Sequence, residues 1–530
     1  MTFSLLKNIQ KLGFIFFLIL ISCSPKQFQQ MSTASDFYSS GAEETLSQLT
    51  LREKIAQMLV YRMNMIAKDV SPQKWNEIES LIESDGIGTI HLWYGDVSSS
   101  LAIMNDMQKR SKIPILFDAD IEYGLNQRFP SGTDLPPLMA IAATSDIKNA
   151  YQVGKIIAKE ARAVGVHWNL SPVVDVNNNP LNPIINTRSF GEDPKSVSEF
   201  GISLMKGLQD HGMLATAKHF PGHGDTETDS HSSLAMIPSD SARLWSVEIS
   251  PFKAMSDAGV DAIMVAHVHA PDYQPEADKP SSMSPFWIQS ILREKIGFKG
   301  VVVTDAMSMG GISKNYSDAF ALIETIKAGS DVIIQNYNYK GSIDTIEKAV
   351  NDGEISIHRI NESVLKVLKM KEKVGLFKST KISLDSFYNS YHKKEHKLIA
   401  KQVAQEAITC VKYDSSIFPF RINNQDTLYV IDIYDSRNNH EMSSVTKGLK
   451  KSRLKIKSLQ IDESDSKVVL NAMLNEIPEN ALVLVNAFAN PKASKDRIFL
   501  PGNETEFLRA LMNKTDRTVL ASLGTPYLIQ

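Results

Sequence analysis

The sequence predicts an α/β protein in which a parallel (β/α)8 barrel of the TIM type precedes a smaller α/β sandwich. Three observations predict this architecture: eight short apolar runs of strand character, amphipathic helical stretches between most of them, and polar residues at the C-terminal ends of the runs. With 530 residues and 43% hydrophobic composition, the chain is long and apolar enough to build two domains with large cores.

The N-terminus is typical of a bacterial export signal. Lys7 and Lys11 precede an apolar stretch of about ten residues, which is too short to span a bilayer. The stretch ends in the sequence LISC at 20–23, which is similar to a lipobox, where small residues admit a peptidase and the cysteine thiol receives a diacylglyceryl group. We therefore expect residues 1–23 to be a lipoprotein signal peptide, with Cys23 as the lipidation site that anchors the protein to a membrane. An ordinary cleaved signal is the alternative.

A polar stretch rich in Ser and Gln follows the signal, and we expect a flexible tether over residues 24–44. Cys410 is the only cysteine besides Cys23, so a lipidated chain has no pair left for an internal disulfide. Stability must then come from packing.

The charge balance excludes several partners. The 57 basic and 60 acidic residues give a net charge of -3, and neither sign forms a long run. A protein that binds nucleic acid usually carries a basic patch or stripe. We therefore expect no nucleic-acid partner and no polyanionic substrate.

The barrel is expected over residues 45–378. Helical stretches at 151–165 and 196–212 are examples of the segments that separate the strands. Eight buried strands that alternate with helices favour a closed parallel barrel. The predicted strands lie at 54–63, 86–95, 114–120, 166–176, 213–221, 260–270, 300–307 and 330–336.

Polar side chains follow these strands at their C-terminal ends. In a parallel barrel this edge carries the active site, because its loops surround one cavity. Contact with solvent is an alternative explanation for polar residues at strand ends. It could account for one or two of them, but it is a weaker explanation for a carboxylate or imidazole at the end of most of the eight strands. The residues are Asp118, Asp120, Asp175, Lys218, His219, His267, His269, Asp305 and Asn336.

The segment KHFPGHGDTETDSH, residues 218–231, is the strongest candidate for an active-site loop. Its two glycines flank a histidine directly after Pro221, which predicts a tight loop. Asp229 and His231 lie two residues apart, and a carboxylate that accepts a hydrogen bond from imidazole raises the histidine pKa above about 6.5. Such a histidine can donate a proton to a leaving oxygen and later accept one from water. A metal-binding loop and a structural loop are alternatives, although the spacing matches no common zinc pattern.

Asp305 is the candidate nucleophile. It follows the apolar run GVVVT, and a carboxylate at the mouth of a barrel strand can attack an anomeric carbon to form a covalent glycosyl-enzyme. A helix N-cap is an equally good explanation of this aspartate from spacing alone. His267 and His269 could contact substrate or serve as structural histidines; we interpret His269 as structural and leave His267 open.

Three motifs together resemble the family 3 glycoside hydrolases, specifically their β-N-acetylglucosaminidase (β-N-acetylhexosaminidase) branch. The resemblance spans roughly residues 45–380 and implies a glycoside hydrolase. It implies that the nucleophile is Asp305 and that the acid/base is His231, held by Asp229. The motifs are KHFPGHGDTETDSH, GVVVTDAMSMGG at 300–311 and DIEYGLNQRF at 120–129.

The same resemblance implies a set of sugar-binding residues. A carboxylate surrounded by fixed cationic donors can pair with vicinal hydroxyls and orient the ring. Tyr123 and Leu125 stand where the family pattern has glycine and arginine, so we expect the rim on the aglycone side to differ. The implied residues are Asp120, which opens the D-x-E-G-G motif, Arg128, eight residues later, Arg188 in NTRSFGEDP, Lys218 and His219.

The resemblance therefore implies a retaining, exo-acting β-N-acetylhexosaminidase that removes terminal N-acetylglucosamine from cell-wall muropeptides or other amino-sugar glycans, with no cofactor or metal. A phosphorylase is the main alternative, because a histidine acid/base does not repel phosphate. A β-glucosidase is less favoured, since that branch usually takes its acid/base from a carboxylate in the second domain. A non-catalytic wall-binding lipoprotein is also less favoured.

The second domain is expected over residues 398–530, after a helical stretch near 354–377 and a charged linker at 379–397. Apolar runs at 427–434, 481–488 and 517–524 alternate with helix-like segments, which indicates a small α/β sandwich. The chain stops just after a strand, so an incomplete domain is left open. The role of this domain and the oligomeric state are not predicted.

Overall fold

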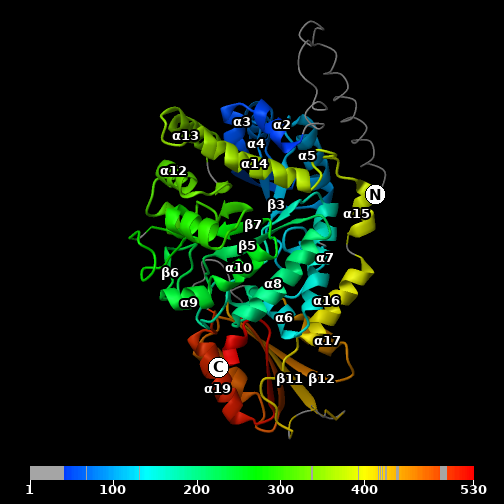
Figure 1. The fold of residues 1–530 in the computed structure, drawn as a ribbon. Helices are drawn as coiled ribbons and strands as arrows, with labels where there is room; N and C mark the ends of the chain where they lie inside the picture. The colour runs from blue at the N-terminus through cyan, green and yellow to red at the C-terminus, as the bar shows by residue number, and fades with distance from the viewer. Residues whose placement is uncertain are drawn as a thin grey trace, which may run out of the picture.

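The computed structural model describes residues 41–529, except 67–68, 131, 278, 336–337, 392, 416, 418, 420–421, 424–425, 437–440 and 490–497 (Figure 1). The predicted signal peptide with Cys23 lies outside the described residues, as do Asn336 and most of the predicted tether. The last part of the tether range begins helix α2 (Ala42–Gln48).

Eight parallel strands form one sheet in the order β10-β1-β2-β3-β4-β5-β7-β9. The sheet closes on itself because β1 pairs with β10 and because Val303 of β9 bridges to Val332, directly before β10. The (β/α)8 barrel predicted from the sequence is therefore confirmed. Its strands are β1 (Leu59–Met65), β2 (Thr89–Gly95), β3 (Leu116–Ala119), β4 (Trp168–Asn169), β5 (Leu214–Phe220), β7 (Ala262–Val265), β9 (Val301–Thr304) and β10 (Ile333–Gln335). A two-stranded parallel ribbon of β6 (Ala235–Met236) and β8 (Val268–His269) lies outside this sheet.

The first predicted strand is partly wrong, because residues 54–58 belong to helix α3 (Leu51–Met58). The Thr50 hydroxyl accepts the Glu53 N–H, and the Glu53 carboxylate accepts the Thr50 N–H, which is a capping box. Helix and strand follow each other without a polar break, so periodicity could not find the boundary between them.

Helices surround the barrel (Figure 1). The two helices that were predicted at 151–165 and 196–212 pack closely against each other. A Cβ at Gly154 would lie 2.3 Å from the Leu204 carbonyl oxygen, and a Cβ at Gly207 would lie 2.3 Å from the Tyr151 carbonyl oxygen. Only glycine permits this backbone approach. The outer elements are α4 (Pro72–Ser80), η2 (Leu81–Asp85), α5 (Val97–Arg110), α7 (Ile147–Ala163), α8 (Pro194–Gln209), α10 (Ser250–Asp257), η6 (Phe286–Lys295), α12 (Asp318–Ala328), α13 (Tyr339–Asn351) and α14 (Ile357–Lys373). Shorter helices in the loops are α6 (Leu138–Ala143), α9 (Ser241–Ser246) and α11 (Gly310–Ser313).

The barrel core has two layers because successive strand residues face opposite sides. In β9, Val302 packs in the large cluster beneath the helices, whereas Val301 and Val303 belong to a separate interior cluster. Met264 and Ile334 of that interior cluster also line the cavity at the barrel mouth. The barrel interior is thus packed below and open above.

The segment predicted as a linker is largely helical. It contains α15 (Leu384–Ser390) and the start of α16 (Lys394–Glu406), which lie along α7 on the barrel surface (Figure 1). The His396 imidazole lies 2.7 Å from the Glu160 carboxylate of α7, with both groups buried. This contact fixes α16 against the barrel.

The second domain is a four-stranded parallel sheet in the order β12-β11-β13-β14. Helix α17 packs on one face, and α18 and α19 pack on the other, so the predicted α/β sandwich is observed. The strand at 455–461 was not predicted. The elements are β11 (Thr427–Tyr434), α17 (Ser444–Lys450), β12 (Lys455–Ile461), α18 (Lys467–Asn475), β13 (Leu482–Phe488), α19 (Gly502–Lys514) and β14 (Thr518–Ser522). Among the described residues of the whole chain, no helix is long and apolar enough to cross a bilayer.

Candidate active site

A cavity of about 1530 Å³ opens at the carboxyl ends of the barrel strands. It brings together all but one of the predicted catalytic and sugar-binding residues; the exception, Asp229, lies directly behind His231. The predicted residues that line the cavity are Asp120, Arg128, Arg188, Lys218, His219, His231 and Asp305.

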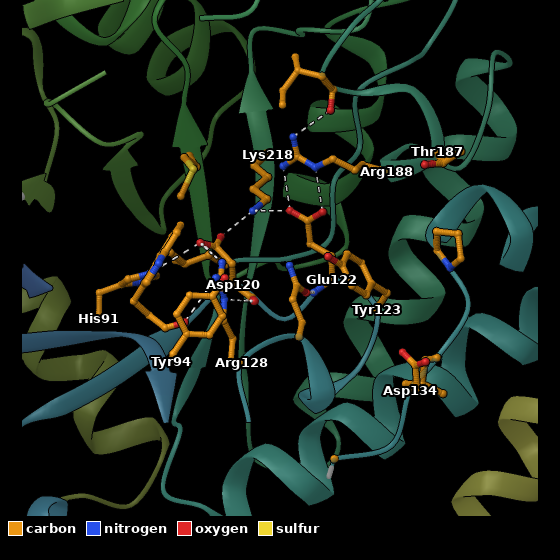
Figure 2. Close-up of a pocket in the computed structure, with 18 of the residues that line it drawn as sticks. His91, Tyr94, Asp120, Glu122, Tyr123, Arg128, Asp134, Thr187, Arg188 and Lys218 are labelled. Atoms are coloured by element: carbon orange, nitrogen blue, oxygen red, sulfur yellow. Dashed lines mark hydrogen bonds and ion pairs between the residues drawn. The ribbon is translucent and has the colours of Figure 1, made fainter. Parts of the chain in front are cut away.

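Asp120 follows β3 and forms one centre of the cavity's charged network (Figure 2). Its carboxylate accepts hydrogen bonds from Lys218 Nζ at 2.7 Å and from Arg128 Nη2 at 3.2 Å. Arg128 Nε also donates to the Asp120 carbonyl oxygen at 2.9 Å. Burial would raise the pKa of Asp120, but the cationic Lys218 and Arg128 hold it far below its usual range. Asp120 is therefore an ionised hydrogen-bond acceptor.

Glu122 is a second centre of this network, and its role was not predicted from the sequence. The Arg188 guanidinium binds it in a fork, with Nε 2.9 Å from Oε2 and Nη2 2.8 Å from Oε1. Lys218 Nζ lies 2.9 Å from the same carboxylate and so bridges Glu122 and Asp120 (Figure 2). Burial is again outweighed by these cations, which hold the pKa of Glu122 well below its usual value. The signal was available, since Glu122 stands two residues after Asp120 in the same motif.

Asp175 orients His219. Its carboxylate accepts the His219 Nδ1–H at 2.7 Å and the backbone N–H groups of His219 and His223 at 3.1 and 2.8 Å. Burial works to raise the pKa of Asp175, but these interactions lower it overall. Because Nδ1 is engaged, Nε2 of His219 is the ring nitrogen that points toward the cavity, 3.5 Å from Arg188 Nη2. From the sequence, Asp175 was predicted to lie at the end of a strand, but no role was predicted for it.

Asp229 and His231 form a hydrogen-bonded pair within the loop after β5. The imidazole Nδ1 lies 2.7 Å from the buried Asp229 Oδ1, and the same oxygen accepts the His231 backbone N–H at 2.9 Å. The His231 side chain is 38% exposed at the cavity wall. Burial works to lower the pKa of His231, but Asp229 and the nearby charge of Asp305 raise it above its usual value, as the sequence predicted.

Asp305 directly follows β9 and faces the same cavity. Its N–H donates to the Val265 carbonyl, and its Oδ1 accepts the Ala306 N–H at 2.8 Å. The N-cap explanation is excluded, because Met309 occupies the N-cap of α11. Burial works to raise the pKa of Asp305, but the neighbouring histidines His219, His267 and His231 bring it below its usual value. Asp305 is thus an ionised carboxylate that is partly exposed to the cavity.

The glycines after Asp305 hold the histidine loop in place. Gly310 N–H donates to the His231 carbonyl oxygen at 3.0 Å, and Gly311 N–H donates to that of Ser230 at 3.2 Å. A Cβ at Gly310 would lie 2.5 Å from the Ser232 carbonyl oxygen, so only glycine allows this approach.

The other two histidines that were predicted at strand ends, His267 and His269, have structural partners. His267 lies between the Ser282 hydroxyl at 2.8 Å and the Ala306 carbonyl at 3.0 Å, and burial lowers its pKa. It therefore supports the backbone beside Asp305, which answers the question that the sequence left open. His269 bonds to Gln274, which agrees with its structural interpretation.

His223 supports the loop from within. It lies between the hydroxyls of Thr226 and Ser230 at 2.7 and 2.8 Å, and burial lowers its pKa to about 4, which keeps the ring neutral. Within the parts of the chain that the structure describes, no three His, Cys, Asp or Glu side chains converge in a way that could hold a metal ion.

Residues 50–370 match the model described as the glycosyl hydrolase family 3 N-terminal domain. A Cellulomonas fimi protein named β-N-acetylglucosaminidase/β-glucosidase is 30% identical over 356 residues, which is 66% of this chain and 63% of that protein. The chain thus spans less than two thirds of this relative's length.

Solved structures share the architecture. A glycoside hydrolase family 3 β-N-acetylglucosaminidase from Paenibacillus sp. str. FPU-7 superposes with a TM-score of 0.79 at 28% identity, covering 91% of each chain. The β-glucoside phosphorylase BglX bound to 2FGlc superposes with a TM-score of 0.82 over 96% of this chain and 91% of that one. At 23% identity, the second likeness concerns the fold alone.

Proposed function

The chain belongs to glycoside hydrolase family 3, and on that premise we propose that it is a retaining, exo-acting β-N-acetylhexosaminidase that releases terminal β-linked N-acetylglucosamine. One observation carries the proposal: a histidine paired with a buried aspartate shares a cavity with an ionised carboxylate at a barrel strand end. The names of the C. fimi and Paenibacillus proteins support N-acetylglucosamine as the sugar.

In the first step, the Asp305 carboxylate attacks the anomeric carbon, and the bond to the leaving oxygen breaks. His231 is suited to protonate that oxygen, because its raised pKa favours the imidazolium and Asp229 leaves Nε2 as its free ring nitrogen. The products of this step are a glycosyl ester on Asp305, a released aglycone and a neutral His231.

In the second step, neutral His231 accepts a proton from a water molecule, and the oxygen of that water attacks the anomeric carbon of the glycosyl ester. The ester to Asp305 breaks, which restores both groups to their starting states. Two displacements at one carbon give overall retention of configuration. No cofactor is required for either step.

The charged network beside Asp305 supplies the sugar-binding groups. Ionised Asp120 and Glu122 accept hydrogen bonds from hydroxyls, while Lys218 and Arg188 donate to hydroxyl oxygens. Together these groups hold the ring with C1 near Asp305.

The proposal is tested by turnover of p-nitrophenyl N-acetyl-β-glucosaminide, with p-nitrophenyl β-glucoside as the comparison. We expect hydrolysis of the first and much slower hydrolysis of the second. Asp305→Ala should abolish turnover while leaving the unfolding transition in place, and proton NMR should detect the β-anomer as the first product. Unchanged activity in Asp305→Ala would rule out this nucleophile.

Phosphorolysis is the second candidate function. An imidazole acid/base carries no negative charge, so phosphate meets less repulsion there than beside a carboxylate. Supplying inorganic phosphate and measuring N-acetylglucosamine 1-phosphate separates the two reactions. Accumulation of the sugar phosphate in place of free sugar would favour the phosphorylase.

We also propose that the protein is exported and lipid-anchored through Cys23, with a tether that ends before helix α2 begins at Ala42 and with residues 45–378 as the catalytic unit. The signal-like features of residues 1–23 support this location. The natural substrate would then be a cell-wall muropeptide or another extracytoplasmic glycan. Membrane fractionation of the wild type and Cys23→Ser tests the anchor, since only the wild type should sediment with membranes.

A further inference from the structure

The cavity extends beyond the catalytic centre to helix α16. One face of this helix contributes to the cavity wall through Lys397, Ala400, Lys401 and Ala404. Tyr123 and Asp134 also line the cavity and lie on the side of Asp120 that is opposite His91 (Figure 2). The cavity therefore has two ends, a sugar-binding end at Asp120 and Glu122 and a second end at α16.

Buried contacts fix the position of α16. Glu160 of α7 accepts from the backbone N–H and hydroxyl of Thr133 at 2.8 and 2.5 Å, and the same carboxylate pairs with His396 of α16. The other end of the helix is held by Asn149, whose amide donates to Glu406 at 2.8 Å. The α16 wall and the segment that carries Asp134 are thus joined through one buried carboxylate.

The two ends of the cavity differ in how their charges are paired. At the sugar-binding end, Arg128, Arg188 and Lys218 are each paired with a carboxylate. Among the described residues, no ion pair or side-chain hydrogen bond engages the ammonium groups of Lys397 and Lys401, both of which are exposed. The second end therefore has two unpaired cations.

Helix stability does not explain these lysines. The first turns of a helix favour negative charge, because the macrodipole places partial positive charge there. Helix α16 instead carries Lys394 and Lys397 in its first turn and Lys401 one turn later, with Glu395 as the acidic residue among them. A role toward a ligand accounts for cations on the face that lines the cavity.

Resting on the hydrolase function proposed above, we infer that Lys397 and Lys401 form an aglycone subsite for a carboxylate on the leaving group. In an exo-acting enzyme, the only substrate portion outside the terminal sugar is the aglycone, so the aglycone is what can reach α16. The substrate class is an N-acetylglucosaminide of an acidic sugar or an acidic glycopeptide. Tyr123, which is 37% exposed and lines the same cavity, offers an aromatic face to that aglycone.

The test compares three substrates in the full-length protein. They are N-acetylglucosamine β-linked to N-acetylmuramic acid, whose lactyl group carries a carboxylate, the methyl ester of the same disaccharide, and neutral p-nitrophenyl N-acetyl-β-glucosaminide. We expect the wild type to prefer the acid over the ester. Lys397→Ala and Lys401→Ala should each raise KM for the acid about fivefold, and the double variant about tenfold or more.

Turnover of the ester and of the nitrophenyl substrate should stay unchanged in these variants. Lys394→Ala is the matched control, because it removes the same charge from the same helix outside the cavity lining. Equal acid-to-ester ratios in the wild type and the double variant would overturn the subsite while leaving the hydrolase intact. Failure of the wild type to hydrolyse even the nitrophenyl substrate would instead overturn the proposed function, and the subsite with it.

Discussion

The carbonyl oxygen of His231 accepts a hydrogen bond from the N–H of Gly310 at 3.0 Å. This bond joins the loop of the proposed proton donor to the segment that follows the proposed nucleophile, Asp305. The position of the imidazole relative to the carboxylate therefore depends on a backbone contact that only glycine at position 310 allows.

Replacing Gly310 with alanine should displace the histidine loop. The added Cβ would lie 2.5 Å from the Ser232 carbonyl oxygen, a contact that the loop must relieve by moving. We expect kcat on p-nitrophenyl N-acetyl-β-glucosaminide to fall about 100-fold or more, because small errors in the position of a catalytic group are costly. Gly448→Ala is the control, since its Cβ would meet nothing within 4 Å. Equal activity in the two variants would contradict the prediction.

The basic limb of the pH profile should report His231. The first step needs the protonated ring, so kcat/KM should fall as the pH rises through the pKa of His231, which Asp229 helps to raise. Asp229→Asn removes that support, and the limb should move to lower pH by about one unit. Glu227→Gln removes an exposed charge from the same loop and should leave the profile unchanged. An unshifted limb in Asp229→Asn would assign the titration to another group.

Glu122→Gln should weaken sugar binding. The substitution breaks the charge-assisted fork to Arg188 and leaves Lys218 with one carboxylate partner instead of two. We expect kcat/KM to fall about 10- to 100-fold. Glu199→Gln, on the exposed surface of α8, should have no effect on kcat/KM. Arg188→Lys should not preserve activity either, because an ammonium lacks the planar fork.

Lys371 should make stability depend on pH. It is fully buried with its Nζ 2.5 Å from Gln57 Oε1, and burial lowers its pKa to about 7. Between that pKa and the unfolded value of 10.5, the unfolded chain binds more protons than the folded protein, so stability contributed by this group rises with pH. The contribution is complete above the unfolded pKa and is lost as the pH falls toward the folded one.

Lys371→Met removes this titration. The variant should unfold at a higher temperature than the wild type near about pH 7, and the difference should shrink toward about pH 10. Differential scanning calorimetry across this range is the measurement. Lys369→Met, 54% exposed on the same helix, is the control and should track the wild type.

The barrel could be predicted because its strands are buried on both faces and stand out as apolar runs. Strand β12 was missed because it lies at the sheet edge, where lysines interrupt its apolar pattern: KIKSLQI has one fully buried residue, Ile461. The start of β1 was wrong because α3 runs directly into it. Hydrophobic periodicity alone shows neither which strand lies at a sheet edge nor where a helix passes directly into a strand.

The residues of the candidate site also fall into two groups, those that could be proposed from the sequence and those that could not. Residues in long motifs, such as Asp305 and His231, could be proposed because their neighbours are distinctive, and the structure places both on one cavity. Glu122 stands in the same motif as Asp120 and could have been proposed on that ground, but its two cationic partners, Arg188 and Lys218, are far away in the sequence and only folding reveals them. His267 could not be interpreted from sequence either, since its partner Ser282 belongs to a separate loop.

Lys218 pairs with both Asp120 and Glu122, so the same side chains contribute to the stability of the fold and to the proposed binding of the sugar. Cations within the fold hold these carboxylates in place, so the hydrogen-bond acceptors need little rearrangement when the sugar binds. The conformational entropy of these side chains is lost when the chain folds and not when the sugar binds. Removing Lys218 would take away the cation that Asp120 and Glu122 share and leave each carboxylate with one arginine partner. Changes in sugar preference at this end therefore require coordinated substitutions, whereas the exposed Lys397 and Lys401 of α16 can be replaced singly without disturbing the buried contacts of that helix, so new substrates are most accessible to evolution at the rim.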